Sequence, residues 1–208
     1  MLYRVDGIGV DIAIEEVTLM DDQGVQRTEG AATQDLLRAP NVEAFILTDD
    51  GVFPNNRKLP LLVYRKVLNP GVPDLIAQVQ AIFAGNGWDG SWVDSIFDFH
   101  HYHSTSHEVL AICGGQAEVC FGGEHGITLT LAAGDVVVIP AGVAHKNLGA
   151  GKDFVVVGAY PHGREHYDMC RGKREERLCA DKNIVSVAIP ESDPLYGPDG
   201  PLTDHWHV

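Results

Sequence analysis

The stretch DFHHYHSTSHEVLAICGG, from Asp98 to Gly115, joins a cluster of histidines directly to an apolar run. Four histidines and one glutamate fall within the nine residues from His100 to Glu108. Imidazole and carboxylate groups are common ligands of first-row metal ions. The stretch therefore raises the hypothesis of a metal site at the start of a buried strand.

Side-chain alternation decides which of these groups can converge. His101 and His103 are two residues apart, so on a strand both rings point to the same face. Glu108 follows His103 by five residues and would point to the opposite face of a continuous strand. Residues 104–106 read STS, which favours a turn. A turn there would bring Glu108 beside the two histidines.

The same alternation places the neighbouring side chains. Leu110 and Ile112 should point inward with Glu108 and line an apolar cavity, whereas His100, Tyr102 and His107 should face away from it. An alternative pair, His103 with His107, would need a helix to bring both rings to one face. The flanking aromatic residues and the serine-rich turn do not favour a helix.

A second stretch, GDVVVIPAGVAHKN from Gly134 to Asn147, offers one more imidazole. Proline is excluded from the middle of a sheet, so Pro140 should end a strand. His145 then opens the next strand and could complete the ligand set.

The two stretches together resemble the paired sequence motifs of the cupin superfamily. Eight positions match in order: His101, His103, Glu108, Gly115, Gly134, Pro140, Gly142 and His145. Ser95 and Gly149 depart from the motifs, which have glycine and asparagine there. The resemblance implies an all-β double-stranded β-helix, or jelly-roll barrel, with one or two peripheral helices. It also implies that the metal ligands are His101, His103, Glu108 and His145.

Within that superfamily, the chain from about residue 41 onward resembles the YjlB-like bacterial cupins, through segments such as PNNRKLPLLVYRKVL and VVGAYPHG. This resemblance commonly implies a homodimer, but no settled reaction. The length of the chain suits a single cupin domain over residues 1–208. We divide the chain into an N-terminal arm (about 1–40), a barrel core (about 41–160) and a C-terminal extension (about 161–208). The arm is not covered by the resemblance, and it could add a strand to its own or a partner's sheet.

Outward from the motifs, periodicity predicts the remaining elements. Apolar residues at helical spacing predict a helix over residues 74–84. Short apolar segments separated by glycines predict strands between residues 92 and 160. Further strands are expected within residues 9–19, 59–68 and 183–189, a charged loop over residues 170–179, and a short helix over residues 33–38.

Composition excludes several classes of partner. A net charge of −14 and a pI near 4.9 argue against nucleic acid and anionic membranes. No run of about 18 apolar residues predicts a membrane span, and the first residues lack the apolar core of a secretory signal. We therefore expect a cytoplasmic protein with reduced cysteines. These are Cys113, Cys120, Cys170 and Cys179.

Three nitrogens and one carboxylate oxygen suit an octahedral Fe(II), Mn(II), Ni(II) or Co(II), with zinc as a further alternative. Two positions would stay open, and the site's net charge of +1 would attract a small anionic substrate. An O2-dependent, dioxygenase-type oxidation is favoured. The alternatives are a non-redox isomerase, lyase or decarboxylase, and a binding module without turnover.

Non-redox chemistry would need a further acid or base near the ion. The weak candidates are Tyr160, Tyr64 and Arg65, of which the last two share one predicted strand and cannot both face inward. Trp88 and Trp92 flank a GWDGSW turn and are expected to cover the end of the barrel. The weakness of these candidates is the reason for favouring the O2-dependent reaction.

Overall fold

The computed structural model describes residues 18–20, 26–28, 35–164 and 166–207. The chain divides into two compact units, Met1–Asp35 and Leu36–Val208. In the first unit, β1 (Thr18–Met20) pairs antiparallel with β2 (Gln26–Thr28). Most of the strand predicted over residues 9–19 lies outside the described residues. Residues 35–38, the described part of the predicted short helix, are not helical.

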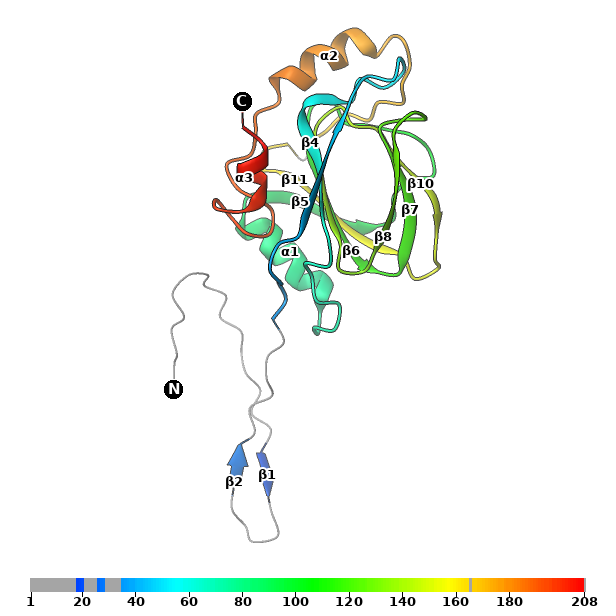
Figure 1. Cartoon of the computed structure of the whole chain (residues 1–208). Helices are drawn as coiled ribbons and strands as arrows, with labels where there is room; N and C mark the ends of the chain where they lie inside the picture. The colour runs from blue at the N-terminus through cyan, green and yellow to red at the C-terminus, as the bar shows by residue number, and fades with distance from the viewer. Residues whose placement is uncertain (1–17, 21–25, 29–34, 165, 208) are drawn as a thin grey trace. The chain divides into compact units, whose positions relative to one another are not determined.

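The second unit is built from two antiparallel β-sheets that face each other (Figure 1). The six-stranded sheet has the order β3 (Val42–Leu47), β4 (Asn56–Tyr64), β9 (Val136–Ile139), β6 (Glu108–Gly114), β11 (Val155–Pro161), β5 (Trp88–Asp94). The three-stranded sheet has the order β10 (His145–Ala150), β7 (Gln116–Phe121), β8 (Ile127–Ala132). This architecture confirms the predicted all-β jelly-roll barrel.

The central strands of the six-stranded sheet are buried on both faces. Its inner face carries Leu110 and Ile112, which pack with Phe121 of the opposite sheet and so confirm their predicted inward orientation. Its outer face carries the alternate residues Val109 and Ala111, which pack against a second apolar layer. Burial on both faces explains why β4, β6 and β9 read as nearly continuous apolar runs.

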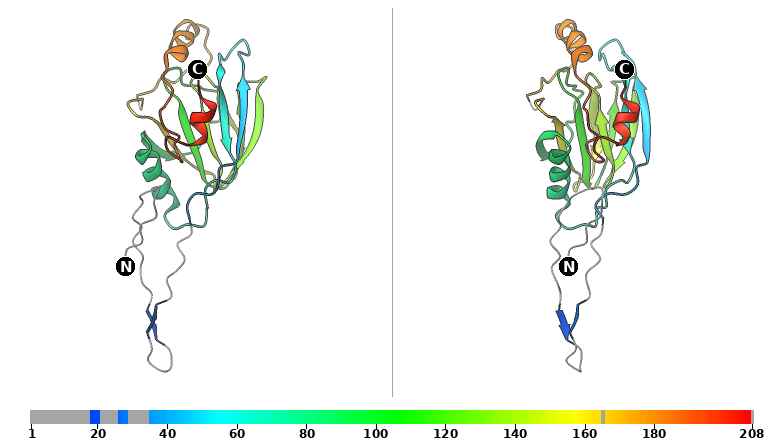
Figure 2. Two further views of the ribbon diagram at one scale, coloured as in Figure 1. Left: turned by 60° about the vertical axis from the view of Figure 1, so that its left-hand side comes forward. Right: turned by 90° about the vertical axis from the view of Figure 1, so that its left-hand side faces the viewer.

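Helices and the C-terminal extension form that second layer. Helix α1 (Leu75–Gly85) confirms the helix predicted over residues 74–84, and its buried residues Leu75, Val79 and Phe83 share one face. Helix α1 packs on β5, β6 and β11, and α3 (Pro201–His205) packs on β4, as Figure 2 shows from two sides. Apolar burial on this outer face therefore ties the extension to the barrel.

Helix α2 (Arg177–Ser186) corrects two predictions. Residues 183–186 belong to this helix, although the β-branched residues Ile184, Val185 and Val187 favoured a strand over residues 183–189. Helix α2 also takes in residues 177–179 of the predicted charged loop. No described strand pairs with residues 183–189. A strand needs a neighbour for its backbone hydrogen bonds, whereas a helix satisfies them internally.

The turn before His145 shows why its motif requires glycine. Gly142 has a φ of +93°, and a Cβ added there would lie 2.6 Å from the backbone oxygen of Asn55. Pro140 directly follows the last residue of β9, and its carbonyl accepts the amide of Val143 at 3.1 Å. His145 then opens β10, as predicted.

No helix in the described part of the chain is long and apolar enough to cross a membrane. The four cysteines are free thiols. The division into arm, barrel and extension within one domain stays a prediction.

Candidate metal centre

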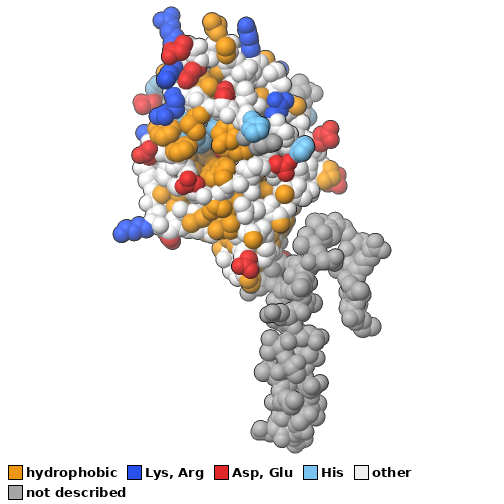
Figure 3. Space-filling model, turned by 180° about the vertical axis from the view of Figure 1, so that it is seen from behind, with side chains coloured by type: hydrophobic (Ala, Val, Ile, Leu, Met, Phe, Trp, Pro, Cys, Tyr) orange, Lys and Arg blue, Asp and Glu red, His pale blue; other side chains and the backbone are white. Residues whose placement is uncertain are grey.

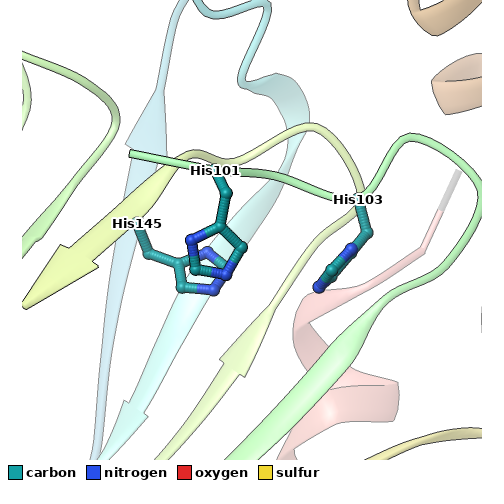
Figure 4. Close-up of side chains that lie close together, drawn as sticks. All are labelled: His101, His103 and His145. Atoms are coloured by element: carbon teal, nitrogen blue, oxygen red, sulfur yellow. The ribbon is translucent and has the colours of Figure 1, made fainter. Parts of the chain in front are cut away.

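Three histidines meet at one end of the barrel interior. His101 and His145 lie opposite each other on neighbouring backbones, and each amide donates to the other residue's carbonyl, at 3.2 and 2.9 Å. One ligand nitrogen of each of these rings, and one of His103, lie within 4.8 Å of one another. All three side chains are buried, and the rings point toward one another (Figure 4). The group can hold a metal ion.

The outer nitrogen of each ring faces a backbone carbonyl. His101 and His145 direct Nδ1 at the carbonyl two residues earlier, at 3.2 and 3.3 Å. His103 directs Nδ1 at the carbonyl of Asp168, at 2.5 Å. A carbonyl only accepts hydrogen bonds, so Nδ1 carries the proton in each neutral ring. Each Nε2 is therefore left with a lone pair available to a metal ion.

Glu108 adds a carboxylate to the three histidines. Its Oε2 lies 3.3 Å from Nε2 of His145 and 3.6 Å from Nε2 of His103. Its Oε1 accepts a hydrogen bond from the hydroxyl of Tyr160 at 2.9 Å. Oε2 is buried, and no described donor hydrogen-bonds to it. Glu108 is the first residue of β6 and follows the predicted turn, which brings it beside the histidines as expected.

The electrostatics of the four groups favour an ionised carboxylate. Burial, followed by the nearby His145, lowers the pKa of His101 to about 3, so that ring is neutral at pH 7. Burial alone would raise the pKa of Glu108, but His103 and His145 outweigh it and hold that pKa below its usual range. Burial would likewise lower the pKa of His103, but Glu108 outweighs it and raises that pKa. A metal ion must therefore compete with a proton on His103.

Asp168 of the C-terminal extension anchors the loop between His103 and Glu108. Its carboxylate accepts the amide and hydroxyl of Ser104 at 2.7 and 2.5 Å. It also accepts the amide and hydroxyl of Thr105 at 3.2 and 3.1 Å. Sequence reasoning missed Asp168, because a single aspartate in an irregular tail carries no recognisable pattern.

A pocket of about 210 Å³ opens beside the four groups. The side chains of Trp92, Phe97, Tyr160, Tyr167 and Met169 contribute to its walls. The indole of Trp92 donates to the hydroxyl of Tyr160 at 2.9 Å, so Trp92 belongs to the site. Tyr167 and Met169 come from the extension, which sequence reasoning left without a role in the site.

Of the three weak catalytic candidates, the structure brings only Tyr160 to the pocket. Tyr64 lies on the outer face of the sheet and donates to Asp193 at 2.5 Å. Arg65 pairs with Glu43 at 3.1 Å and with Asp135 at 3.2 Å. Neither side chain lines the pocket.

The histidine that precedes Glu108 is buried rather than exposed. His107 accepts the amide of Ala141 through Nδ1 at 2.9 Å, and its ring lies 4.7 Å from that of Trp206. Tyr102 is also fully buried, and Trp88 is buried with its indole donating to the carbonyl of Ser192. These residues face away from the pocket but lie beneath other parts of the chain. Four histidines of the C-terminal extension are exposed: His162, His166, His205 and His207.

Comparison with known proteins places the chain in a family. A cupin-domain model matches residues 95–157, which contain all four predicted ligands. The uncharacterized protein YjlB of Bacillus subtilis (strain 168) is 43% identical over 164 residues, covering 79% of this chain and 96% of that protein. The chain belongs to the YjlB-like cupins.

Solved structures show more distant likenesses to this cupin. One is the acireductone dioxygenase of Bacillus anthracis with a cadmium ion in its active centre: 19% identity, 46% of this chain and 69% of that chain, TM-score 0.34. Another is YcfD, a ribosomal oxygenase of Escherichia coli in complex with cobalt and succinic acid: 13% identity, 74% and 42% coverage, TM-score 0.34. Likenesses this distant assign no activity to the cupin.

Proposed function

We propose that this cupin is a mononuclear metalloenzyme that acts on a small anionic metabolite. Its metal ligands are His101, His103, Glu108 and His145, and its ion is Fe(II), Mn(II), Ni(II) or Co(II), with zinc as the alternative. One observation carries the proposal. All three histidines use Nδ1 on backbone carbonyls, which leaves Nε2 free near the unpaired Oε2 of Glu108.

Charge supports an anionic substrate. Three neutral imidazoles and one carboxylate leave a divalent ion with a net charge of +1. A bound ion would supply Lewis acidity and, for a redox-active metal, electron transfer on the side that faces the pocket. A carboxylate, enolate or other oxyanion complements that charge.

The environment of Tyr160 supports an O2-dependent, dioxygenase-type oxidation. Its hydroxyl accepts from Trp92 and donates to Oε1 of Glu108, each at 2.9 Å. Burial, followed by the charge of Glu108, raises the pKa of Tyr160 above its usual range. The hydroxyl is therefore committed to holding Glu108, and it is a poor general acid or base. Chemistry that relies on the ion and O2 fits this arrangement best.

Tyr167 favours a second candidate function, a non-redox isomerase, lyase or decarboxylase. It lines the pocket, with its ring centre 4.4 Å from that of His103 and 4.1 Å from that of Tyr160. A phenol beside bound substrate can move a proton without any change of oxidation state. Substitution of Tyr167 by Phe should abolish a non-redox reaction and leave an O2-dependent one largely intact.

The first experiment is elemental analysis of protein purified without added metal. We expect near-stoichiometric first-row metal in the wild type and loss of most of it in His101→Ala and His145→Ala. His205→Ala, which removes an exposed histidine of α3, is the matched control and should retain the metal. Full occupancy in the two ligand variants would contradict the ligand assignment.

The second experiment screens small anions with the metal-loaded protein, with and without O2. Consumption of O2 that depends on the added anion would support the oxidation, and anaerobic turnover would support the non-redox candidate. Tight binding without turnover would identify a binding module instead. The homodimer and the cytoplasmic location expected from the sequence stay predictions, and a monomeric mass in solution would contradict the first.

A further inference from the structure

The lining of the pocket beside the metal centre carries acidic side chains but no lysine or arginine among the described residues. Among the described residues that line it, the charged ones are Asp94 and Glu108, both acidic, and none is a lysine or arginine. Arg171 lies with its guanidinium carbon 3.4 Å from the ring centre of Phe99, but it is not part of the lining. A negatively charged group in the pocket can therefore meet a cation only where the three histidines and Glu108 would hold one.

Part of the pocket's lining is apolar and open to solvent, and this open side forms the mouth of the pocket. Val93, Phe97 and Met169 line the pocket and are 46%, 46% and 42% exposed. Figure 3 shows a face of the molecule on which hydrophobic side chains gather around a hollow. Large apolar side chains left exposed around a cavity favour a ligand that removes them from water. The mouth therefore suits an uncharged apolar group.

The pocket's volume limits the size of that group. An apolar cavity of about 150 Å³ holds one benzene molecule, and this pocket measures about 210 Å³. The space corresponds to about one aromatic ring together with a carboxylate. Trp92 and Phe97 offer ring surfaces against which such a body can pack.

We propose that the pocket selects monocarboxylates with an apolar body of about one aromatic ring, carboxylate toward the metal centre and body toward the mouth. This inference rests on the proposed function, because the carboxylate needs the bound ion as its partner. A second anionic group would meet no lysine or arginine in the described lining, which carries the acidic Asp94 instead. Dicarboxylates and phosphorylated compounds are therefore disfavoured.

Binding of matched probes to the metal-loaded cupin tests this selection. The probes are monomethyl terephthalate, terephthalate and benzamide. Binding is measured by isothermal titration calorimetry and by the change in tryptophan fluorescence, to which Trp92 in the pocket wall contributes. The monomethyl ester has nearly the size of terephthalate but one charge, and benzamide has none. We expect the ester to bind at least about tenfold more tightly than either of the other probes.

Two charge variants sharpen the test. Asp94→Lys should reduce the preference for the ester over terephthalate several-fold, because it puts a cation at the pocket's edge. Asp199→Lys makes the same charge change at an exposed site outside the pocket and should leave the preference unchanged. Arg171→Gln should not weaken ester binding, and a large loss there would overturn the proposal by making Arg171 the partner of the carboxylate.

The outcomes separate this inference from the proposed function. The selection is overturned if terephthalate binds as tightly as the ester or more tightly, or if protein that carries its metal does not bind the ester. Neither result contradicts the proposed metal centre. Protein that takes up no metal after reconstitution overturns both, and elemental analysis of the same sample identifies that case.

Discussion

Two buried carboxylates lie on opposite faces of the six-stranded sheet, and they differ in how well they are hydrogen-bonded. Glu108 faces the barrel interior, where Oε1 has one donor, Tyr160, and Oε2 has none among the described residues. Asp193, in the C-terminal extension on the outer face, is 0% exposed. Both carboxylates are removed from water, so the difference in their partners is informative.

Asp193 has a full set of donors. Its Oδ1 accepts the amides of Leu195 and Tyr196 at 2.8 and 3.0 Å. Its Oδ2 accepts the amide of Leu202 at 3.0 Å and the hydroxyl of Tyr64 at 2.5 Å. These bonds shape the turn before α3 and join the extension to β4. A buried carboxylate satisfied in this way has a structural role.

Glu108 shows the opposite pattern. A buried carboxylate oxygen without a donor is costly, and here it lies beside Nε2 of His103 and His145, whose other nitrogens are already engaged. A cation bound among these atoms would satisfy all of them. The comparison indicates that the outer carboxylate stabilises the fold, and it supports the proposed role of the inner one as a metal ligand.

The largest expected effect is the loss of folding stability in Asp193→Ala. The change leaves the Tyr64 hydroxyl and three amides without an acceptor, so the free energy of unfolding should fall by about 3–5 kcal/mol. Urea denaturation measures it, with Glu191→Ala at an exposed neighbouring position as control. A loss below about 1 kcal/mol would remove the structural role of Asp193.

Glu108→Gln should have the opposite effects, a large loss of metal affinity and little loss of folding stability. Metal affinity should fall at least about 100-fold, because losing a ligand costs more than losing an outer-shell contact. The metal-free protein should change its free energy of unfolding by less than about 1 kcal/mol, since glutamine can still accept from Tyr160. Chelator competition and urea denaturation measure the two quantities. Strong destabilisation of the metal-free variant would erase the contrast with Asp193.

Asp168→Ala should weaken metal binding by about 10- to 100-fold, the usual cost of losing an outer-shell contact. The change frees Ser104 and Thr105, and it loosens the backbone whose carbonyl orients His103. Asp204→Ala, at an exposed position in α3, is the control. Unchanged affinity, measured by chelator competition, would show that the loop holds His103 without Asp168.

The smallest expected effect is a rise in metal affinity with pH. The pKa of His103 is raised, so this ring keeps its proton to higher pH than an ordinary histidine, whose pKa is about 6.5. The ion must displace that proton, so affinity should increase by up to about tenfold per pH unit from pH 6 upward, until His103 is deprotonated. His101, with a pKa of about 3, does not contribute in this range.

Removing Glu108 provides a check on the pH effect. Glu108 raises the pKa of His103, so Glu108→Gln should flatten the dependence of metal affinity on pH. Calorimetry of metal binding at several pH values, in buffers of different ionisation enthalpy, counts the protons released. A slope that persists in Glu108→Gln would place the competing proton on another group.

The convergence of the four proposed ligands could be predicted because its geometry is local. Two-residue alternation aligns His101 with His103, a three-residue turn realigns Glu108, and a proline-glycine turn precedes His145. The residues that support the set are not local. Asp168 reaches Ser104 across 64 positions, and Trp92 reaches Tyr160 across 68. No periodicity in the chain encodes such pairs.

The same limit explains the other discrepancies. Tyr64 was a weak candidate because its strand could turn it inward, but its partner Asp193 is 129 positions away and holds it on the outer face. Residues 183–189 have the β-branched composition of a strand, yet without a neighbouring strand residues 183–186 form the end of α2. His107 is buried because Trp206 of the distant C-terminus covers it.

Alternation, turn residues and two motifs within 55 residues, from Ser95 to Gly149, were enough to predict the barrel and the convergence of the four proposed ligands. The folded structure was needed to show which nitrogen of each histidine is free, which buried carboxylate oxygen has no described donor, and that the C-terminal extension contributes to the pocket wall. The reason is physical. Strand direction depends on neighbouring residues, whereas hydrogen-bond satisfaction depends on groups that folding brings together from anywhere in the chain.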